Sequence, residues 1–135
     1  MRIAFGTDER TEVTDAVKAF LADRGHTVEV VGEGDAWPDV GRRVGEAVSS
    51  KAADRGVVCC WTGTGVSIAA NKVPGVRAAL CTDAETARGA RRWNDANVLA
   101  LGLRLTTTAV AEELLDAFLS TETDADGAAD AARLR

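Results

Sequence analysis

Two hydrophobic patterns alternate along the chain, and together they predict its secondary structure. Short runs rich in apolar and β-branched residues predict strands, because a strand covered on both faces of a parallel sheet reads as a nearly continuous apolar stretch. Five strands are expected in this way, at residues 2–6, 27–31, 56–61, 76–82 and 98–102. Between them lie segments with helical periodicity, so the pattern predicts βαβ units wound into one parallel sheet.

The helical segments show which faces are buried. Val40, Val44, Ala47 and Val48 form one apolar stripe, and similar stripes predict a helix between the first two strands and further helices over 84–93 and 107–119. The expected fold class is therefore α/β, a three-layer, doubly wound Rossmann-like fold. For a five-stranded parallel sheet of this kind we expect the strand order 2-1-3-4-5.

That topology also predicts where a ligand binds. In open α/β sheets, ligands bind at the carboxyl ends of the strands, beside the point where the strand order reverses. Here that point lies between the first and third strands. Asp8 follows the first strand and Cys60 ends the third, so the two should be neighbours.

Length and local composition predict one domain with a distinct tail. The 135 residues fit a single core of ordinary size. After Leu119 the residues become small and acidic, with little to bury. We therefore expect an α/β domain over residues 1–122 and a loose C-terminal tail over 123–135 that reaches a neighbouring subunit.

Charge and cysteine content exclude several classes of partner. The formal net charge is −5 without a basic stripe, which argues against nucleic acid. No apolar run approaches the ~18 residues of a membrane span, and the N-terminal strand is too short for a signal peptide, so a cytoplasmic protein is expected. The three cysteines lack the spacing of a zinc site. These features favour a small-molecule ligand, free thiols and no metal.

Cys60 leads into a glycine-rich loop, Thr62-Gly63-Thr64-Gly65, between a strand and a short helix. Converging backbone N–H groups and the positive end of the helix suit an anion or a developing oxyanion. The loop matches neither the Walker sequence nor the dinucleotide fingerprint. On spacing alone, a tight turn with no ligand is an equally good interpretation.

A longer stretch of sequence favours a function. The segment from Gly65 through Ser67-Ile68-Ala69-Ala70-Asn71-Lys72 to Cys81, followed by Asn94-Asp95-Ala96-Asn97-Val98 and on to Gly102, closely resembles the family of ribose-5-phosphate isomerase B and galactose-6-phosphate isomerase. The resemblance extends to Ile3–Asp8, to Trp37-Pro38-Asp39 and to residues 116–122. It implies an aldose–ketose isomerase that works through a cis-enediolate and needs no cofactor.

The resemblance also assigns roles to individual residues. Cys60 matches the cysteine that moves a proton between C1 and C2 of the sugar, and a thiolate near a helix N-terminus is a chemically reasonable base. The backbone of Gly63, Thr64 and Gly65 would hold the enediolate oxygen. Further matches to substrate contacts are Thr62, Asn94, Arg104 and Asp8. Without the resemblance, Cys60 reads as a buried packing residue, Asp8 as a helix cap and Arg104 as a solvated surface residue.

The chain departs from the family pattern at polar site positions. Glu9 stands where the family has a histidine after Asp8, Trp93 replaces the histidine assigned to ring opening, and Trp61 replaces a glycine. In the tail only Arg133 matches one of the family's two arginines. The sole histidine, His26, lies in a turn before the second strand and is not expected to be catalytic.

These departures leave three hypotheses. The first is an isomerase with Cys60 as base, acting on an altered sugar or hydroxycarbonyl substrate beside Trp61 and Trp93. The second is a catalytically silent ligand-binding or regulatory paralogue, and the third is a different reaction with Glu9 as acid/base. The resemblance implies a homodimer or homotetramer, in which Asn94 and the tail complete the pocket of a neighbouring subunit.

Overall fold

The structure is a computed structural model that describes residues 1–134. Over these residues the chain forms five parallel strands and six helices. The strands are β1 (Arg2–Thr7), β2 (Thr27–Glu33), β3 (Arg55–Cys60), β4 (Ala78–Leu80) and β5 (Val98–Gly102). The helices are α1 (Glu12–Asp23), α2 (Trp37–Ser49), α3 (Thr64–Asn71), α4 (Ala84–Asn94), α5 (Thr108–Ser120) and α6 (Ala125–Ala131). Within this range no helix is both long and apolar enough to cross a membrane.

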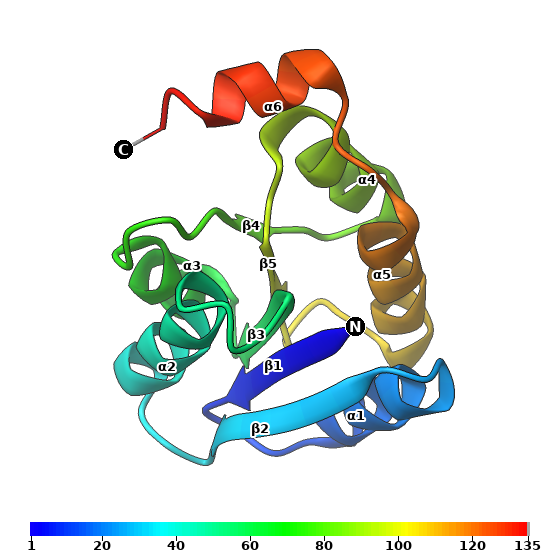
Figure 1. Cartoon of the computed structure of the whole chain (residues 1–135). Coiled ribbons are helices and arrows are strands. Elements are labelled where there is room, and N and C mark those ends of the chain that lie inside the picture. Colours follow the sequence, from blue (N-terminus) through cyan, green and yellow to red (C-terminus); the bar gives the residue numbers. More distant parts are fainter. Residues whose placement is uncertain (135) are drawn as a thin grey trace.

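The expected α/β class with a central parallel sheet is confirmed. Helices α2 and α3 cover one face of the sheet, and α1, α4 and α5 cover the other (Figure 1). Successive residues of a strand point to opposite faces. Accordingly Cys59 belongs to the apolar core beneath α1, α4 and α5, whereas Cys60 belongs to the core beneath α2 and α3.

The predicted order of the last two strands is wrong. The observed order is β2-β1-β3-β5-β4, so β5 lies between β3 and β4. The connection from β3 to β4 therefore moves outward past one strand, and the connection from β4 to β5 moves back. Because βαβ crossovers are right-handed, this reversal places α3 and α4 on opposite faces. The reversal between β1 and β3 is common to both orders, so the predicted ligand site is not affected.

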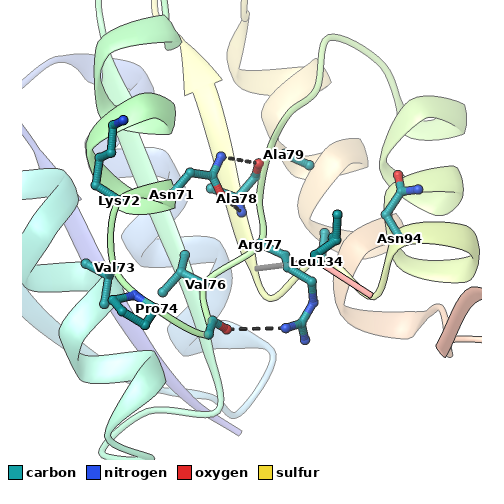
Figure 2. Close-up of a pocket in the computed structure, with 12 residues that line it drawn as sticks. Asn71, Lys72, Val73, Pro74, Val76, Arg77, Ala78, Ala79, Asn94 and Leu134 are labelled. Carbon is teal, nitrogen blue, oxygen red and sulfur yellow. Dashed lines mark hydrogen bonds between the residues drawn. The ribbon is translucent and has the colours of Figure 1, made fainter. Parts of the chain in front are cut away.

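Strand β4 is much shorter than the 76–82 expected, and it forms the edge of the sheet. All three of its residues are half-buried, whereas every residue of β5 is buried. Asn71, at the end of α3, covers part of the free edge: its side-chain amide donates to the Ala78 carbonyl at 3.0 Å and accepts from the Ala78 N–H at 2.7 Å. Figure 2 shows Asn71 beside Ala78. Asn71 thus fixes the end of α3 against the sheet.

The C-terminal segment is a docked helix rather than the loose tail expected from its composition. Asp124 caps α6 through the Gly127 N–H at 2.6 Å, and its own N–H donates to the Arg92 carbonyl of α4 at 3.1 Å. Gly127 and Ala131 are buried. Figure 1 shows α6 beside α4, beyond the end at which β5 begins.

Candidate active site

The loop that follows β3 turns sharply around Gly63. Gly63 has φ +79°, in the left-handed region, and it is the N-cap of α3. Its backbone N–H donates to the Cys60 Sγ atom at 3.2 Å. The N–H groups of Thr64 and Gly65 open α3, where backbone donors have no acceptor within the helix. The loop therefore directs backbone donors toward one region beside the Cys60 thiol.

Cys60 differs from the other two cysteines in its surroundings. It is 5% exposed at the carboxyl end of the sheet, and its sulfur accepts a hydrogen bond from the Gly63 N–H. Burial, with smaller contributions from Cys60 and Asp8, raises the pKa of Cys59 far above its ordinary value. Burial and the nearby Asp83 raise the pKa of Cys81 to about 11. Cys59 and Cys81 are therefore held as neutral packing residues.

Asp8 lies beside this loop, as the strand topology predicted. Its backbone N–H donates to the Cys59 carbonyl at 3.3 Å. Its Oδ1 atom is buried and has no hydrogen-bond partner among residues 1–134. Burial, followed by the charge of the exposed Glu9, raises the pKa of Asp8. A buried carboxyl oxygen without a partner is available to a hydroxyl group of a ligand.

Arg104 joins the same edge of the sheet through the backbone. The Leu103 N–H donates to the Cys60 carbonyl at 2.9 Å, and the Arg104 N–H donates to the Trp61 carbonyl at 2.8 Å. The side chains of Arg104 and Trp61 are both exposed, Trp61 at 54%. Next along the loop, the hydroxyls of Thr62 and Thr64 bond each other at 2.8 Å. The site therefore has a cationic and an aromatic side chain at its rim.

Trp37 is a site residue that the sequence reasoning missed. It begins α2, and its ring packs so closely over Gly65 that a Cβ there would come within 2.9 Å of the ring. The ring remains 44% exposed. The Trp37-Pro38-Asp39 segment was the signal in the sequence, but its position facing the loop depends on how α2 crosses α3.

Trp93, Asn94 and Arg133 do not join Cys60 within one chain. Cys60 pairs in register with Gly102 at the end of β5, whereas Asn94 precedes Val98 at its beginning. The five residues of β5 span ~13 Å at the usual rise per residue, so Cys60 and Asn94 lie beside opposite ends of this strand. The exposed Arg133 follows α6, which packs on the end of α4 that carries Trp93 and Asn94. The candidate site residues therefore form two groups.

Two cavities flank the edge strand β4, and Asn94 lines both. One, of about 520 Å³, lies between the α3–β4 connection and Leu134 (Figure 2). The other, of about 510 Å³, is lined by Leu80, Cys81 and Trp93, whose ring rests on Gly89. Neither cavity is lined by Cys60 or Asp8. Since Leu80 also packs against Gly63, the second cavity approaches the loop from behind.

The described residues contain no group of three or more side chains arranged to hold a metal ion. The chemical groups at the loop are a thiol with a backbone donor, a carboxyl group with one buried oxygen and the first N–H groups of a helix. This set is suited to moving protons on a hydroxycarbonyl compound, where negative charge develops on oxygen.

Comparison with known proteins gives the family. The Ribose/Galactose Isomerase family matches residues 3–135. This chain belongs to that family. It is 40% identical over 124 residues to the galactose-6-phosphate isomerase subunit LacB of Clostridium acetobutylicum, covering 88% of this chain and 72% of the relative. It is 36% identical over 135 residues to the D-erythrulose-4-phosphate isomerase of Pectobacterium atrosepticum, covering 96% and 89%.

A solved structure from the same family has the same fold. The ribose-5-phosphate isomerase B of Clostridium thermocellum superposes with a TM-score of 0.91 at 40% identity, covering 98% of this chain and 94% of that one. The resemblance stated from the sequence motifs is thus confirmed at the level of family and fold. The three relatives are named for different sugar phosphates, so family membership leaves the substrate open.

Proposed function

We propose that this protein is a sugar-phosphate isomerase that interconverts an aldose and a ketose through a cis-enediolate, with Cys60 as the base. Membership of the isomerase family supports the reaction class. The observation that carries the residue assignment is the Gly63 N–H directed at the Cys60 Sγ atom at 3.2 Å, beside the first free N–H groups of α3. One loop thereby supplies both a base and donors for an oxyanion.

The proposed reaction needs no co-reactant, because the proton that leaves the substrate returns to it. The Cys60 thiolate removes the proton from C2 of the aldose, and the C–H electron pair forms the C1–C2 double bond while negative charge moves to O1. The N–H groups of Thr64 and Gly65 stabilise that charge. Cys60 then returns the proton to C1, and the hydroxyl proton of O2 moves to O1, which leaves the ketose. Asp8 accepts a hydrogen bond from a substrate hydroxyl or, when protonated, donates one.

We propose further that the substrate differs from ribose 5-phosphate. No histidine stands at positions 9 or 93; instead the loop carries the exposed ring of Trp61, and the exposed ring of Trp37, from α2, packs over Gly65. Losing a positioned acid or base costs ~10²- to 10⁴-fold in rate. Flat apolar walls favour a linear or partly apolar hydroxycarbonyl compound over a ring that must be opened.

A substrate panel tests this proposal. We expect kcat/KM for ribose 5-phosphate below about 10⁴ M⁻¹s⁻¹, the low end of ordinary enzymes, and at least one other compound to be turned over faster. The panel holds galactose 6-phosphate, D-erythrulose 4-phosphate and the unphosphorylated sugars. Proton NMR in D₂O reports both product and exchange at the carbon next to the carbonyl. Ordinary efficiency on ribose 5-phosphate would show that the altered-substrate proposal is wrong, and binding without any exchange would favour the silent paralogue.

We propose that each site is formed by two copies of the chain. One copy supplies the loop after β3, and the other supplies Trp93, Asn94 and Arg133. The separation of the two groups along the sheet supports this, and so do the exposed apolar residues Leu105 near Trp61 and Leu134 near Asn94. In a two-fold dimer the same pair of surfaces meets twice, which gives two equivalent sites.

Mixing two inactive variants tests the shared site. When Cys60→Ser and Asn94→Ala copies exchange subunits, half of the dimers are mixed and each has one intact site, so about a quarter of wild-type activity should return. Each variant alone serves as the control. Sedimentation at micromolar concentration should give a dimer or a dimer of dimers. A monomer, or a mixture that stays inactive although subunits exchange, would contradict the proposal.

A further inference from the structure

The turn after α4 is organised around the Asp95 carboxylate. Asp95 has φ +48°, in the left-handed region, and directly follows Asn94. Its Oδ1 atom accepts from Arg91 Nη1 at 3.1 Å and lies 2.9 Å from Thr123 Oγ1, while Oδ2 accepts from Arg77 Nη2 at 3.1 Å. The Asp95 carbonyl also accepts from Arg77 Nε at 2.7 Å. One residue thus joins α4, the segment before β4 and the C-terminal segment.

Arg91 is the buried member of this cluster. Its side chain is 3% exposed, and its Nη1 and Nε atoms donate to the carbonyls of Ala96, at 2.6 Å, and Thr121, at 3.2 Å. A buried guanidinium is costly unless its charge is balanced. The Asp95 carboxylate supplies that balance. Burial alone would raise the pKa of Asp95, but the hydrogen bonds of Thr123 and Arg91 and the charge of Arg77 lower it, so the charge is maintained.

The C-terminal segment contacts the backbone of the last turn of α4. The Thr123 hydroxyl lies 2.9 Å from the Arg91 carbonyl, and the Asp124 N–H donates to the Arg92 carbonyl. Gly127 packs directly on the backbone of Arg92 and Trp93, where any Cβ would collide with the Arg92 carbonyl. The C-terminal segment therefore packs on the last turn of α4, which ends at Asn94.

We infer that Asp95 is a positioning residue, which fixes the C-terminal segment 121–131 and the Trp93–Asn94 turn in one geometry and thereby presents them together as a single wall. The inference rests on the proposed function for what this wall contacts, namely a sugar phosphate at the loop of a second copy. Asp95 itself faces Arg77, Arg91 and Thr123, so it acts through Asn94 and the tail rather than on the substrate.

Hydrogen exchange measured by mass spectrometry tests the inference on the full-length protein. In Asp95→Asn, amides of residues 121–131 should exchange on the order of 10- to 100-fold faster, the range expected when hydrogen bonds to a charged group are lost. Amides of β1 and β3 should be unchanged. Thr123→Val removes a single hydroxyl and should give a smaller change in the same segment. Asp116→Asn is the matched control, because its exposed carboxylate pairs with Arg24 at 3.0 Å on a different surface.

Kinetics separate positioning from a merely structural role. For the best sugar phosphate of the panel, Asp95→Asn should raise KM roughly 10-fold while kcat changes little, because binding contacts are lost and the Cys60 loop is intact. Unchanged exchange in 121–131 would overturn the inference, and so would a loosened segment with an unchanged KM. If the wild type turns over no sugar phosphate, the proposed function fails, and the exchange data alone then decide whether Asp95 fixes this geometry.

Discussion

Cys60→Ser is expected to abolish turnover while leaving the fold intact. The replacement is nearly isosteric, but a hydroxyl is far less acidic than a thiol and cannot act as the base at neutral pH. Losing the proton-transfer group should lower kcat by ~10²- to 10⁴-fold. Because the Cys60 side chain already accepts a hydrogen bond from the Gly63 N–H at the end of β3, which a serine hydroxyl can also accept, thermal stability and sugar-phosphate binding should change little. Turnover by NMR and binding by calorimetry are the measurements.

Cys59→Ser is the matched control, one residue earlier and on the other face of the sheet. Cys59 is fully buried in the apolar core beneath α1, α4 and α5, so a hydroxyl there should cost about 1–3 kcal/mol of stability. Turnover per folded molecule should persist. Alkylation should also be faster at Cys60 than at Cys59 or Cys81. If Cys60→Ser keeps its turnover, the proposed base is wrong, and Asp8 and Glu9 become the carboxylates to test.

The sequence could predict that Asp8 and Cys60 lie close together, because this proximity depends on few assumptions. It requires only that the first and third strands are parallel neighbours at the point of reversal, and β1 and β3 pair as expected. The order of β4 and β5 depends on more than each strand's own pattern. Both runs are apolar, so neither pattern shows which strand lies at the edge, and the pairing of Asn71 with Ala78 is a tertiary contact that leaves no periodic signal.

Residues 123–134 show why composition alone misjudged the tail; residue 135 lies outside the described residues. Few of its side chains are large and apolar, yet it docks through backbone groups and through the absence of a side chain at Gly127. Such contacts need no hydrophobic pattern. The sequence motifs likewise identified Asn94 and Arg133 as candidates without showing that one chain holds them at the opposite end of the sheet from Cys60.

Gly63→Ala is expected to disrupt both the loop and the stability of the domain. A left-handed φ costs an L-residue about 1–2 kcal/mol. The new Cβ would also lie 2.5 Å from Leu80 Cδ1 and 2.9 Å from the backbone at Leu101 and Gly102, and such overpacking adds about 1–3 kcal/mol. The total loss of about 2–5 kcal/mol in the free energy of unfolding is measurable by urea denaturation.

Gly75→Ala separates the backbone cost from the collision. Gly75 has φ +86°, but its nearest neighbour to an added Cβ would be Ser49 at 4.0 Å, so only the backbone cost of about 1–2 kcal/mol should appear. The difference between the two variants measures how firmly β5 and Leu80 hold the loop. Since Gly63 also donates its N–H to Cys60, the same displacement should remove turnover in Gly63→Ala molecules that remain folded. Equal stability losses in the two variants would mean that the loop moves to accommodate the added methyl group. If Gly63→Ala were then also active, turnover would not require the Gly63 N–H to be fixed at the Cys60 sulfur.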